Sequence, residues 1–445
     1  MDNKYYLLNV SISGIKNIKE EVRLDFYKKT INKNFDPEKY RIKAIYGENG
    51  SGKSALITAV KIFQDMHSYE NYLNESKTQI FLDETINKTT HTFRFRCEFL
   101  LDKDPKTIYN YSIQIGKEKE GLYEIQYEIL QMKNGNFTSN KYKTLFETKN
   151  GELMHINCTD QERDIVKRKT TNLLSTHPFM CLYLIKWIQD ASFISVACSG
   201  KFFVYIVNCI EFILFVLTVY LGETDRHELY FFQKKMKENA MGQQPLINEL
   251  LEQNVHKRFI ASVNKKLIYK ISFEKYKEQV NRLTQFIKIF KPDLVSIDID
   301  AKDYGDQYAC ELNLNYGDYA INKEFESTGI KKLISLFDCF MSASTGDIVF
   351  VDEMDSNLND VYLCKLIEYF MYYGKGQLCF TTHNLDPMSI LKENRNSIDF
   401  LSSDNHLVSW TSRGNATPEN CYKNGMIEDS PFNVEATDFI GILGE

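Results

Sequence analysis

Residues 42–63 read IKAIYGENGSGKSALITAVKIF, and this stretch decides the fold of the chain. Its central residues 47–54 fit the pattern G-x-x-x-x-G-K-[ST] at every fixed position. The apolar run 42–46 has the length and flanks of a buried strand, and residues 55–65 carry apolar side chains at helical spacing. The sequence therefore predicts a strand, a phosphate-binding loop and a helix within an α/β fold.

The residue types in this loop suit a phosphate ligand. Glycines let the backbone wrap closely around the anion, and the loop N–H groups and the first helical turn point at it. Lys53 would reach the β- and γ-phosphates of ATP, and the Ser54 hydroxyl would bind Mg²⁺. A chance Gly/Ser-rich turn is the alternative, but the flanking strand and helix count against it. We therefore expect ATP and Mg²⁺ as cofactors, with the phosphates bound by Gly47, Glu48, Asn49, Gly50, Ser51, Gly52, Lys53 and Ser54.

A second predicted strand, within residues 347–353, ends in two carboxylates. Asp352 is placed to hold the Mg²⁺ shell, directly or through water. Glu353 could orient and deprotonate an attacking water. An acidic pair after a strand is weak on its own, but nucleotide hydrolysis needs both a metal carboxylate and a base. Together with the phosphate loop, the pair predicts ATP hydrolysis.

His383 follows a further predicted strand, residues 377–381. The usual alternative at such a position is a structural histidine, whose ring nitrogens form hydrogen bonds within the fold. Ligand sites in open α/β sheets lie beyond the carboxyl ends of the strands. We therefore predict that His383 contacts the γ-phosphate. Upstream, residues 326–329 open a predicted helix that runs to about Met341.

Composition is ordinary for a globular protein, with 43% hydrophobic and 26% charged residues. The formal net charge of -6 argues against a uniformly basic nucleic-acid binder. The ten cysteines include no C-x-x-C pair, so neither a zinc site nor a disulfide framework is indicated. The first residues lack the apolar core of a signal peptide, and we expect a cytoplasmic protein.

The remainder of the first 158 residues reads as β-rich. Alternating patterns of period two indicate half-buried antiparallel strands. A plausible hairpin turn is Asn134-Gly135, and residues 68–90 read as a polar connection. The predicted strands are residues 5–13, 22–26, 92–99 and 123–129.

From residue 160 to residue 292 the pattern is helical, with predicted helices that include 246–268 and 273–290. Residues 202–221 are nearly continuous apolar sequence, long enough to span a membrane. Glu211 sits in the middle, where a charge is costly in lipid, so burial between lobes or in an interface is the favoured alternative. Two strands, 294–299 and 309–315, are then expected to return to the core.

In chain order, these motifs resemble the ATP-binding-cassette head group, which includes the SMC, RecF-like and double-strand-break-repair ATPases. The signature STG before a Lys-rich helix, FVDEMDSNL and FTTHN most resemble a smaller branch. Its members are stand-alone bacterial ATPases linked to abortive infection and phage defence, such as the AbiL-like, Septu, PARIS and retron-associated ATPases. The resemblance covers residues 1–65 and 320–405.

The resemblance implies an α/β ABC-ATPase head with a phosphate-loop core sheet, an antiparallel β subdomain and a helical insertion lobe. Residues 1–158 would form the N-terminal half of the head with the β subdomain, 159–292 the helical insertion lobe, and 293–445 the C-terminal half of the head. Two heads would dimerise face to face and bind two ATP molecules at their interface, and a higher oligomer is possible.

The resemblance also implies roles for single residues. Lys53, Glu353 as general base and His383 would be catalytic, and Asp352 would support Mg²⁺ together with Ser54. Asp355 would belong to a loop that communicates across the dimer. The residues that would cap ATP bound by the opposite subunit are Ser327, Thr328 and Gly329.

Two positions depart from the family pattern. The usual signature has two consecutive glycines where this chain has Thr328-Gly329, and many relatives carry a histidine where it has Asn359. The glutamine of the family's Q-loop is not marked by any motif. Three glutamines are candidates: Gln64, Gln114 and Gln126.

Three functions compete at this stage. The first is an ATPase that switches a separate effector protein, such as a nuclease, in anti-phage defence, with DNA or a phage product as trigger. About 60 residues follow His383, too few for the Toprim nuclease of OLD-type relatives, so the effector is expected on another chain. The second is a RecF- or SMC-like ATPase that acts directly on DNA. The third, a membrane assembly or transporter cassette, has the least support.

Overall fold

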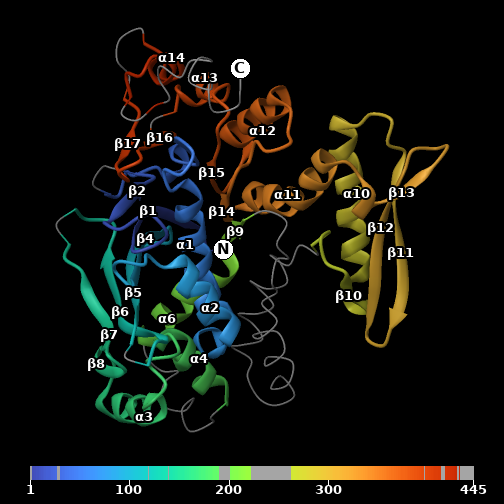
Figure 1. Cartoon of the computed structure of the whole chain (residues 1–445). Helices are drawn as coiled ribbons and strands as arrows, with labels where there is room; N and C mark the ends of the chain where they lie inside the picture. Colours follow the sequence, from blue (N-terminus) through green and yellow to red (C-terminus); the bar gives the residue numbers. More distant parts are fainter. Residues whose placement is uncertain are drawn as a thin grey trace.

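The computed structural model describes residues 3–27, 31–118, 120–138, 140–189, 201–221, 262–394, 396–411, 416–427 and 430. These residues form a mixed α/β structure built around three sheets (Figure 1). The predicted fold class, a core sheet with an antiparallel β subdomain and additional helices, is confirmed.

The core sheet has six strands in the order β17-β16-β3-β15-β14-β9. Five neighbouring strands are parallel, namely β16, β3, β15, β14 and β9. Strand β17 pairs with β16 in the antiparallel direction. Because parallel strands all end at one edge, the residues after β3, β14 and β15 meet there. The strands are β3 (Ile42–Tyr46), β9 (Leu217–Tyr220), β14 (Ile348–Val351), β15 (Gln377–Thr381), β16 (Ile398–Leu401) and β17 (Leu407–Ser409).

A seven-stranded antiparallel sheet, in the order β2-β1-β4-β5-β6-β7-β8, confirms the predicted β subdomain. Its strand β6 ends at Asn134 and β7 begins at Lys143. The two strands pair in the antiparallel direction, so Asn134-Gly135 does begin a hairpin connection, as predicted, and this connection runs to residue 142. The strands are β1 (Tyr5–Ser13), β2 (Val22–Asp25), β4 (Thr92–Leu101), β5 (Thr107–Lys117), β6 (Tyr123–Asn134), β7 (Lys143–Lys149) and β8 (Glu152–Ile156).

Helix α1 (Lys53–Ser68) lies between these two sheets. One side of the helix packs on the antiparallel sheet, where the Phe63 ring stacks on Phe95 at 4.2 Å between centroids. The same hydrophobic cluster contains Ile45 and Phe350 of the core sheet. The helix that carries the predicted phosphate-binding lysine is thus fixed on two faces.

The opposite face of the core sheet is covered by α11 (Thr328–Thr345) and α12 (Asp360–Tyr373). Leu336 and Phe340 of α11 pack there with Ile367 of α12 against strand residues such as Val349. The layers are therefore antiparallel sheet, α1, core sheet, and the α11–α12 pair. Short helices α13 (Met388–Leu391) and α14 (Pro418–Lys423) follow near the end of the described chain (Figure 1).

Residues 68–90, predicted to be a polar connection, contain helix α2 (Ser76–Thr85). Only Thr78, Leu82 and Thr85 of this helix are buried. With a single large apolar side chain among them, the segment shows no apolar period that would predict a helix.

The apolar stretch 202–221 is buried, as predicted, but it is not one helix. It continues from α6 (Lys201–Glu211) through a π-helical turn (Phe212–Val216) into β9, which joins the edge of the core sheet. Glu211 is paired, as expected, because its Oε2 accepts hydrogen bonds from Asn3 Nδ2 at 2.9 Å and Tyr5 Oη at 2.7 Å. Among the described residues, no helix has the length and apolar character needed to cross a bilayer.

Strands 296–304 and 307–315 do not return to the core sheet, which corrects the prediction for this region. They are β11 (Ser296–Tyr304) and β12 (Gln307–Asn315), which form a separate sheet with β10 (Leu267–Tyr269) and β13 (Ala320–Asn322). Helix α10 (Phe273–Phe290) packs on this sheet, and α11 links the lobe to the core (Figure 1). Alternating apolar and polar residues predict a strand but do not indicate the strand with which it pairs. Both strands were therefore predicted correctly, and the sheet to which they belong was not.

The range predicted as a helical insertion contains α3 (Asp160–Thr170), α4 (Phe179–Gln189) and α6, and it also supplies β9 to the core sheet. Of the predicted helix 246–268, residues 246–261 lie outside the described residues. Its last two residues, 267 and 268, belong to β10 instead. The division of the chain at residues 158 and 292 stays a prediction.

Candidate nucleotide site

The phosphate loop connects β3 to α1, as predicted. A Cβ atom at Gly47 would lie 2.4 Å from the carbonyl oxygen of Leu401, so a side chain cannot be accommodated there. Gly52 precedes the helix with φ of 109°, a left-handed conformation that favours glycine. Two asparagines brace the loop: Asn17 Nδ2 donates to Gly50 O at 2.8 Å, and Asn405 Nδ2 donates to Ser51 O at 3.0 Å.

Lys53 lies inside the curve of this loop and is 6% exposed. Its ammonium group donates to the carbonyl oxygens of Gly47 and Glu48, both at 2.8 Å. Burial lowers the pKa of Lys53, and the charges of nearby carboxylates oppose that shift. In decreasing order of effect, these carboxylates belong to Asp352, Glu353, Asp355 and Glu48. The predicted lysine and the predicted acidic residues are therefore brought together.

The acidic residues follow β14 at the carboxyl edge of the core sheet. The amide of Asp352 donates to Tyr220 O of the neighbouring β9 at 3.0 Å. Thr381 Oγ1 donates to Asp352 Oδ1 at 2.6 Å and accepts from the Glu353 amide at 2.7 Å. Both carboxylate positions are therefore fixed by the two strands that flank β14.

Asp355 lies in the loop between β14 and α12. Its Oδ2 accepts hydrogen bonds from the backbone amides of His383 and Asn384, both at 3.2 Å. Its Oδ1 is buried and has no hydrogen-bond partner in the part of the chain that the structure describes. An ionised oxygen in this state is costly unless a cation or donor faces it.

His383 lies directly beyond β15, as predicted, and its side chain is exposed. Partial burial of the imidazole, and then the charge of Lys53, lower the pKa of His383 below its ordinary value. The carboxylates of Asp355, Glu353 and Asp352 partly offset this shift. The ring is therefore neutral at pH 7 and can donate or accept a hydrogen bond beside Lys53.

The predicted Mg²⁺ residues fit that ion. Mg²⁺ takes oxygen ligands and is usually held by one or two carboxylates together with phosphate oxygens and water. Asp352 offers Oδ2, for which no protein hydrogen bond exists in the described chain, and Ser54 offers its hydroxyl at the start of α1. The buried, unpartnered Oδ1 of Asp355 adds a third oxygen that calls for a positive charge.

The signature residues lie at the other end of the site, at the start of α11. Ser327 caps the helix by accepting from the Ile330 amide at 3.4 Å, and both Ser327 and Thr328 are exposed. A Cβ atom at Gly329 would lie 2.9 Å from Asn357 O in the loop after Asp355. In the described part of the chain, no hydrogen bond or ion pair joins these three residues to the phosphate loop.

Sequence reasoning missed two residues, Lys332 and Thr381. Lys332 is 8% exposed, and its ammonium lies 5.0 Å from the ring centroid of Tyr220. Burial lowers the pKa of Lys332, and the carboxylates of Glu353, Asp352 and Asp355, in that order, oppose this. The Lys-rich start of the helix was visible in the sequence, but nothing in the pattern shows which lysine turns inward.

None of the three Q-loop candidates reaches the carboxylates in this structure. Gln64 Nε2 donates to Leu217 O at 2.5 Å. Gln114 and Gln126 bond to each other at 3.1 Å on the antiparallel sheet. The identity of that glutamine stays unassigned.

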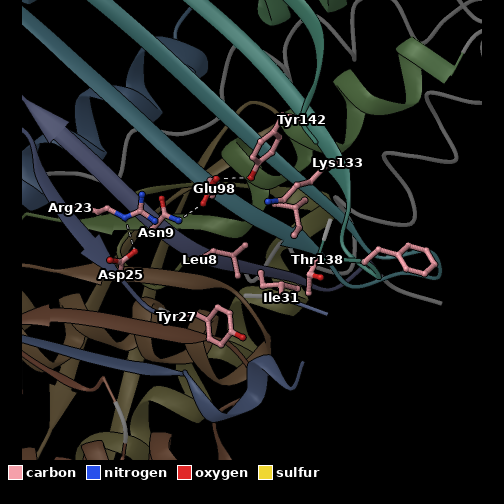
Figure 2. A pocket seen from close by; sticks show the side chains of 12 residues that line it. Leu8, Asn9, Arg23, Asp25, Tyr27, Ile31, Glu98, Lys133, Thr138 and Tyr142 are labelled. Carbon is pink, nitrogen blue, oxygen red and sulfur yellow. Dashed lines mark hydrogen bonds and ion pairs between the residues drawn. The ribbon is translucent and has the colours of Figure 1, made fainter. Parts of the chain in front are cut away.

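A hollow of about 420 Å³ lies on the face of the antiparallel sheet opposite α1 (Figure 2). Glu98 in its wall accepts from Asn9 Nδ2 at 2.5 Å and Tyr142 Oη at 2.6 Å. Arg23 Nε is 2.8 Å from Asp25 Oδ1. Because these side chains pair with one another, we assign the hollow to the polar face of the sheet and not to the nucleotide site.

No protein-family description matches this sequence, and no curated protein matches it. Among solved structures, the chain is similar to an Smc head bound to the C-terminal winged-helix domain of ScpA, with 15% identity, a TM-score of 0.45 and coverage of 91% of this chain and 98% of that one. It is also similar to the SMC head domain from Thermotoga maritima, with 14% identity, a TM-score of 0.33 and coverage of 92% of this chain and 100% of that one. A third similar structure is the recombination mediator protein RecF with ATP, with 12% identity, a TM-score of 0.38 and coverage of 92% of this chain and 98% of that one. At these values, the assignment of the site rests on the geometry above.

Proposed function

We propose that this chain binds Mg·ATP at the carboxyl edge of its core sheet and hydrolyses it to ADP and phosphate. The observation that carries the proposal is the meeting of Lys53, Asp352 and Glu353, from segments about 300 residues apart, beside a loop that has no room for a side chain at Gly47. In a purely structural ion cluster the polar atoms usually pair with one another, whereas here Asp355 Oδ1 is buried with no hydrogen-bond partner among the described residues.

Different residues of the chain bind the phosphates, hold the metal ion and accept the proton. The loop amides and Lys53 hold the β- and γ-phosphates, so Lys53 exchanges its two carbonyl partners for phosphate oxygens. Asp352 and Ser54 would hold Mg²⁺, which supplies charge neutralisation between the phosphates. Glu353 accepts a proton from water as the water oxygen bonds to the γ-phosphorus and the bond to the β-phosphate oxygen breaks. ADP and inorganic phosphate are the products.

The site is completed by a second copy of the chain. Within one copy, the outer side of the γ-phosphate would face water, where stabilisation of the transferring group is weak. Ser327 lies exposed and Gly329 half-buried at the N-terminus of an 18-residue helix, a position suited to bind an anion. We assign them to the nucleotide of the partner, so that ATP joins two heads face to face.

A mixture of two variants tests this arrangement. Ser327→Arg should leave ATP binding by the single chain nearly intact but prevent ATP-dependent dimerisation and hydrolysis. Lys53→Ala should not bind ATP. Mixed together, they should rebuild one working site, made of the phosphate loop of the first and the helix start of the second. Light scattering and ATPase assays would show this, and full activity of Ser327→Arg as a monomer would contradict the shared site.

The biological role we favour is an ATP-driven switch for a separate effector in anti-phage defence. The support is the resemblance of residues 327–329, 350–358 and 380–384 to the defence-associated branch. Direct action on DNA, as in the RecF and SMC group, fits the same nucleotide site. Salt-dependent DNA binding with DNA-stimulated hydrolysis would favour the second role. A partner that co-purifies with the native protein and is released or activated by ATP turnover would favour the first.

A further inference from the structure

Thr381, the last residue of β15, bridges the two acidic residues of the site. Its side chain is fully buried, at 0% exposure. The hydroxyl donates its only proton to Asp352 Oδ1 at 2.6 Å, and its oxygen accepts the Glu353 amide proton at 2.7 Å. One hydroxyl group therefore fixes the side chain of the first residue and the backbone of the second.

The backbone at Glu353 needs such support. Its φ is 45°, in the left-handed region that residues other than glycine rarely adopt. The next amide, that of Met354, donates to the carbonyl oxygen of Thr381 at 3.0 Å. Two consecutive amides after β14 are thus held by the side chain and the main chain of a single residue, and this turn sets the direction of the Glu353 side chain.

The hydrogen bond to Asp352 also decides which oxygen is available. Oδ1 is occupied by the Thr381 hydroxyl, so Oδ2 is the atom that remains for a metal ion or its water. A ligating carboxylate that is held by a hydrogen bond in this way keeps its orientation and loses less rotational freedom when the ion binds.

We propose that Thr381 is a positioning residue of the ATPase site, which aims Asp352 at Mg²⁺ and Glu353 at the attacking water. The inference rests on the proposed function. It goes beyond that function because it adds a residue whose hydroxyl is used entirely by Asp352 and the Glu353 amide and therefore acts through these two residues. Thr381 would thereby couple the strand that leads to His383 to the carboxylates after β14.

The matched pair Thr381→Ser and Thr381→Ala separates the hydroxyl from packing. Both variants lose the methyl group, and only serine keeps the hydroxyl. Thr381→Val is the complementary variant, because it keeps the shape and loses the hydroxyl. Thr170→Val is the control: Thr170 is 2% exposed and its hydroxyl donates to Val166 O at 2.9 Å in α3, outside the site.

We expect kcat of Thr381→Ala and Thr381→Val to fall about 10- to 100-fold, the range typical when a residue supporting metal ligands is lost. The KM for ATP should change by less than about threefold, because Lys53 and the loop are intact. Thr381→Ser should stay within about threefold of the wild type, and so should Thr170→Val. A purely structural hydroxyl would instead give folded variants with unchanged kcat.

A binding measurement keeps the test independent of turnover. Mn²⁺ can be titrated in the presence of a non-hydrolysable ATP analogue and followed by electron paramagnetic resonance. Affinity should fall about tenfold or more in Thr381→Ala and be retained in Thr381→Ser. Equal affinities of the two variants, or equal kcat in an active protein, would overturn the role of Thr381. A wild type that binds the analogue but never hydrolyses ATP would overturn the proposed function instead, and the Mn²⁺ titration would still decide on Thr381.

Discussion

Two clusters of ionisable side chains lie inside the protein, one at each end of α1. At its start, Lys53 meets the carboxylates of Asp352, Glu353 and Asp355. Near its end, His67 belongs to a chain of hydrogen bonds, called the relay below. It continues through Tyr111 of β5 and Glu128 of β6 to the Phe179 amide of α4. Both clusters are buried and both combine acids with bases, but they differ in whether their polar atoms are all used.

The relay is closed. His67 Nδ1 lies 2.8 Å from Phe63 O, His67 Nε2 lies 2.8 Å from Tyr111 Oη, and Tyr111 Oη lies 2.8 Å from Glu128 Oε1. Glu128 Oε2 accepts from the Phe179 amide at 2.7 Å. Burial raises the pKa of Glu128 to about 7 and lowers the pKa of His67 to about 4.

The tautomer of His67 follows from its partner. Phe63 O can only accept, so the neutral ring carries its proton on Nδ1. Tyr111 Oη donates to Glu128 Oε1, which limits the rise in the pKa of Glu128 that burial causes. Each polar group of the relay therefore has a protein partner within hydrogen-bonding distance.

The cluster at the start of α1, by contrast, keeps polar atoms that have no partner among the described residues, and we call it the open cluster. Asp355 Oδ1 is buried without a partner, and the ammonium of Lys332 forms no ion pair in the described chain. The comparison teaches that burial and shifted pKa values alone do not mark a functional site. Unused donors and acceptors that converge on one space do, because they need a ligand to satisfy them.

The largest expected difference comes from the same substitution in each cluster. Glu353→Gln removes the proton acceptor, so ATP hydrolysis should fall by roughly 10²-fold or more while ATP stays bound. Glu128→Gln keeps the shape and an amide oxygen that can accept from the Phe179 amide, and it lies outside the nucleotide site, so hydrolysis should be unchanged. Steady-state ATPase assays with ATP-binding titrations measure both. Equal ATPase activity of the two variants would contradict a functional difference between the two clusters.

Removing a cation should have a smaller effect, and only the open cluster should respond to ligand. Lys332→Met takes away a buried cation whose pKa is lowered by burial more than the three carboxylates raise it, so stability without nucleotide should not fall. Mg·ADP supplies positive charge to the same carboxylates and should raise the melting temperature of Lys332→Met more than that of the wild type. Thermal melting with and without Mg·ADP measures both. The neighbouring Lys331→Met serves as control and should respond to Mg·ADP as the wild type does; a Lys332→Met protein with the wild-type response would contradict the electrostatic account.

The smallest effect is the pH dependence of the relay. The pKa of Glu128 is about 7 in the folded chain and ordinary when unfolded, so the folded state holds an extra proton in between. Its contribution to stability is full below the unfolded pKa and is lost as pH rises through 7. The wild type should lose about 1 kcal/mol relative to Glu128→Gln between pH 6 and pH 8. Denaturant unfolding at both pH values measures this, and a pH-independent difference would mean that Glu128 is ionised in the folded state.

The open cluster could be predicted in large part because its parts are local motifs. The loop 47–54 and the strand before Asp352 carry their chemistry in short, contiguous patterns, and the structure brings Lys53, Asp352, Glu353, Asp355 and His383 to one edge. Strand order did not have to be known, because parallel strands end on the same side.

What the sequence did not reveal depends on contacts between distant segments. Thr381 and Lys332 are ordinary residues until β15 and α11 pack against β14. The last residues of the apolar stretch, Leu217–Tyr220, form a core strand, but continuous apolar sequence does not distinguish a buried strand from the end of a buried helix. The relay was equally hidden, since His67 and Glu128 show no pattern in common.

The most direct test of the nucleotide site is a calorimetric titration of Mg·ATP into the wild type and into Lys53→Ala. We expect saturable binding by the wild type, because the loop and Lys53 together hold the β- and γ-phosphates. We expect no measurable binding by Lys53→Ala at the same concentrations, with the fold retained. Equally tight binding of Mg·ATP by a folded Lys53→Ala protein would contradict the assignment of the nucleotide site.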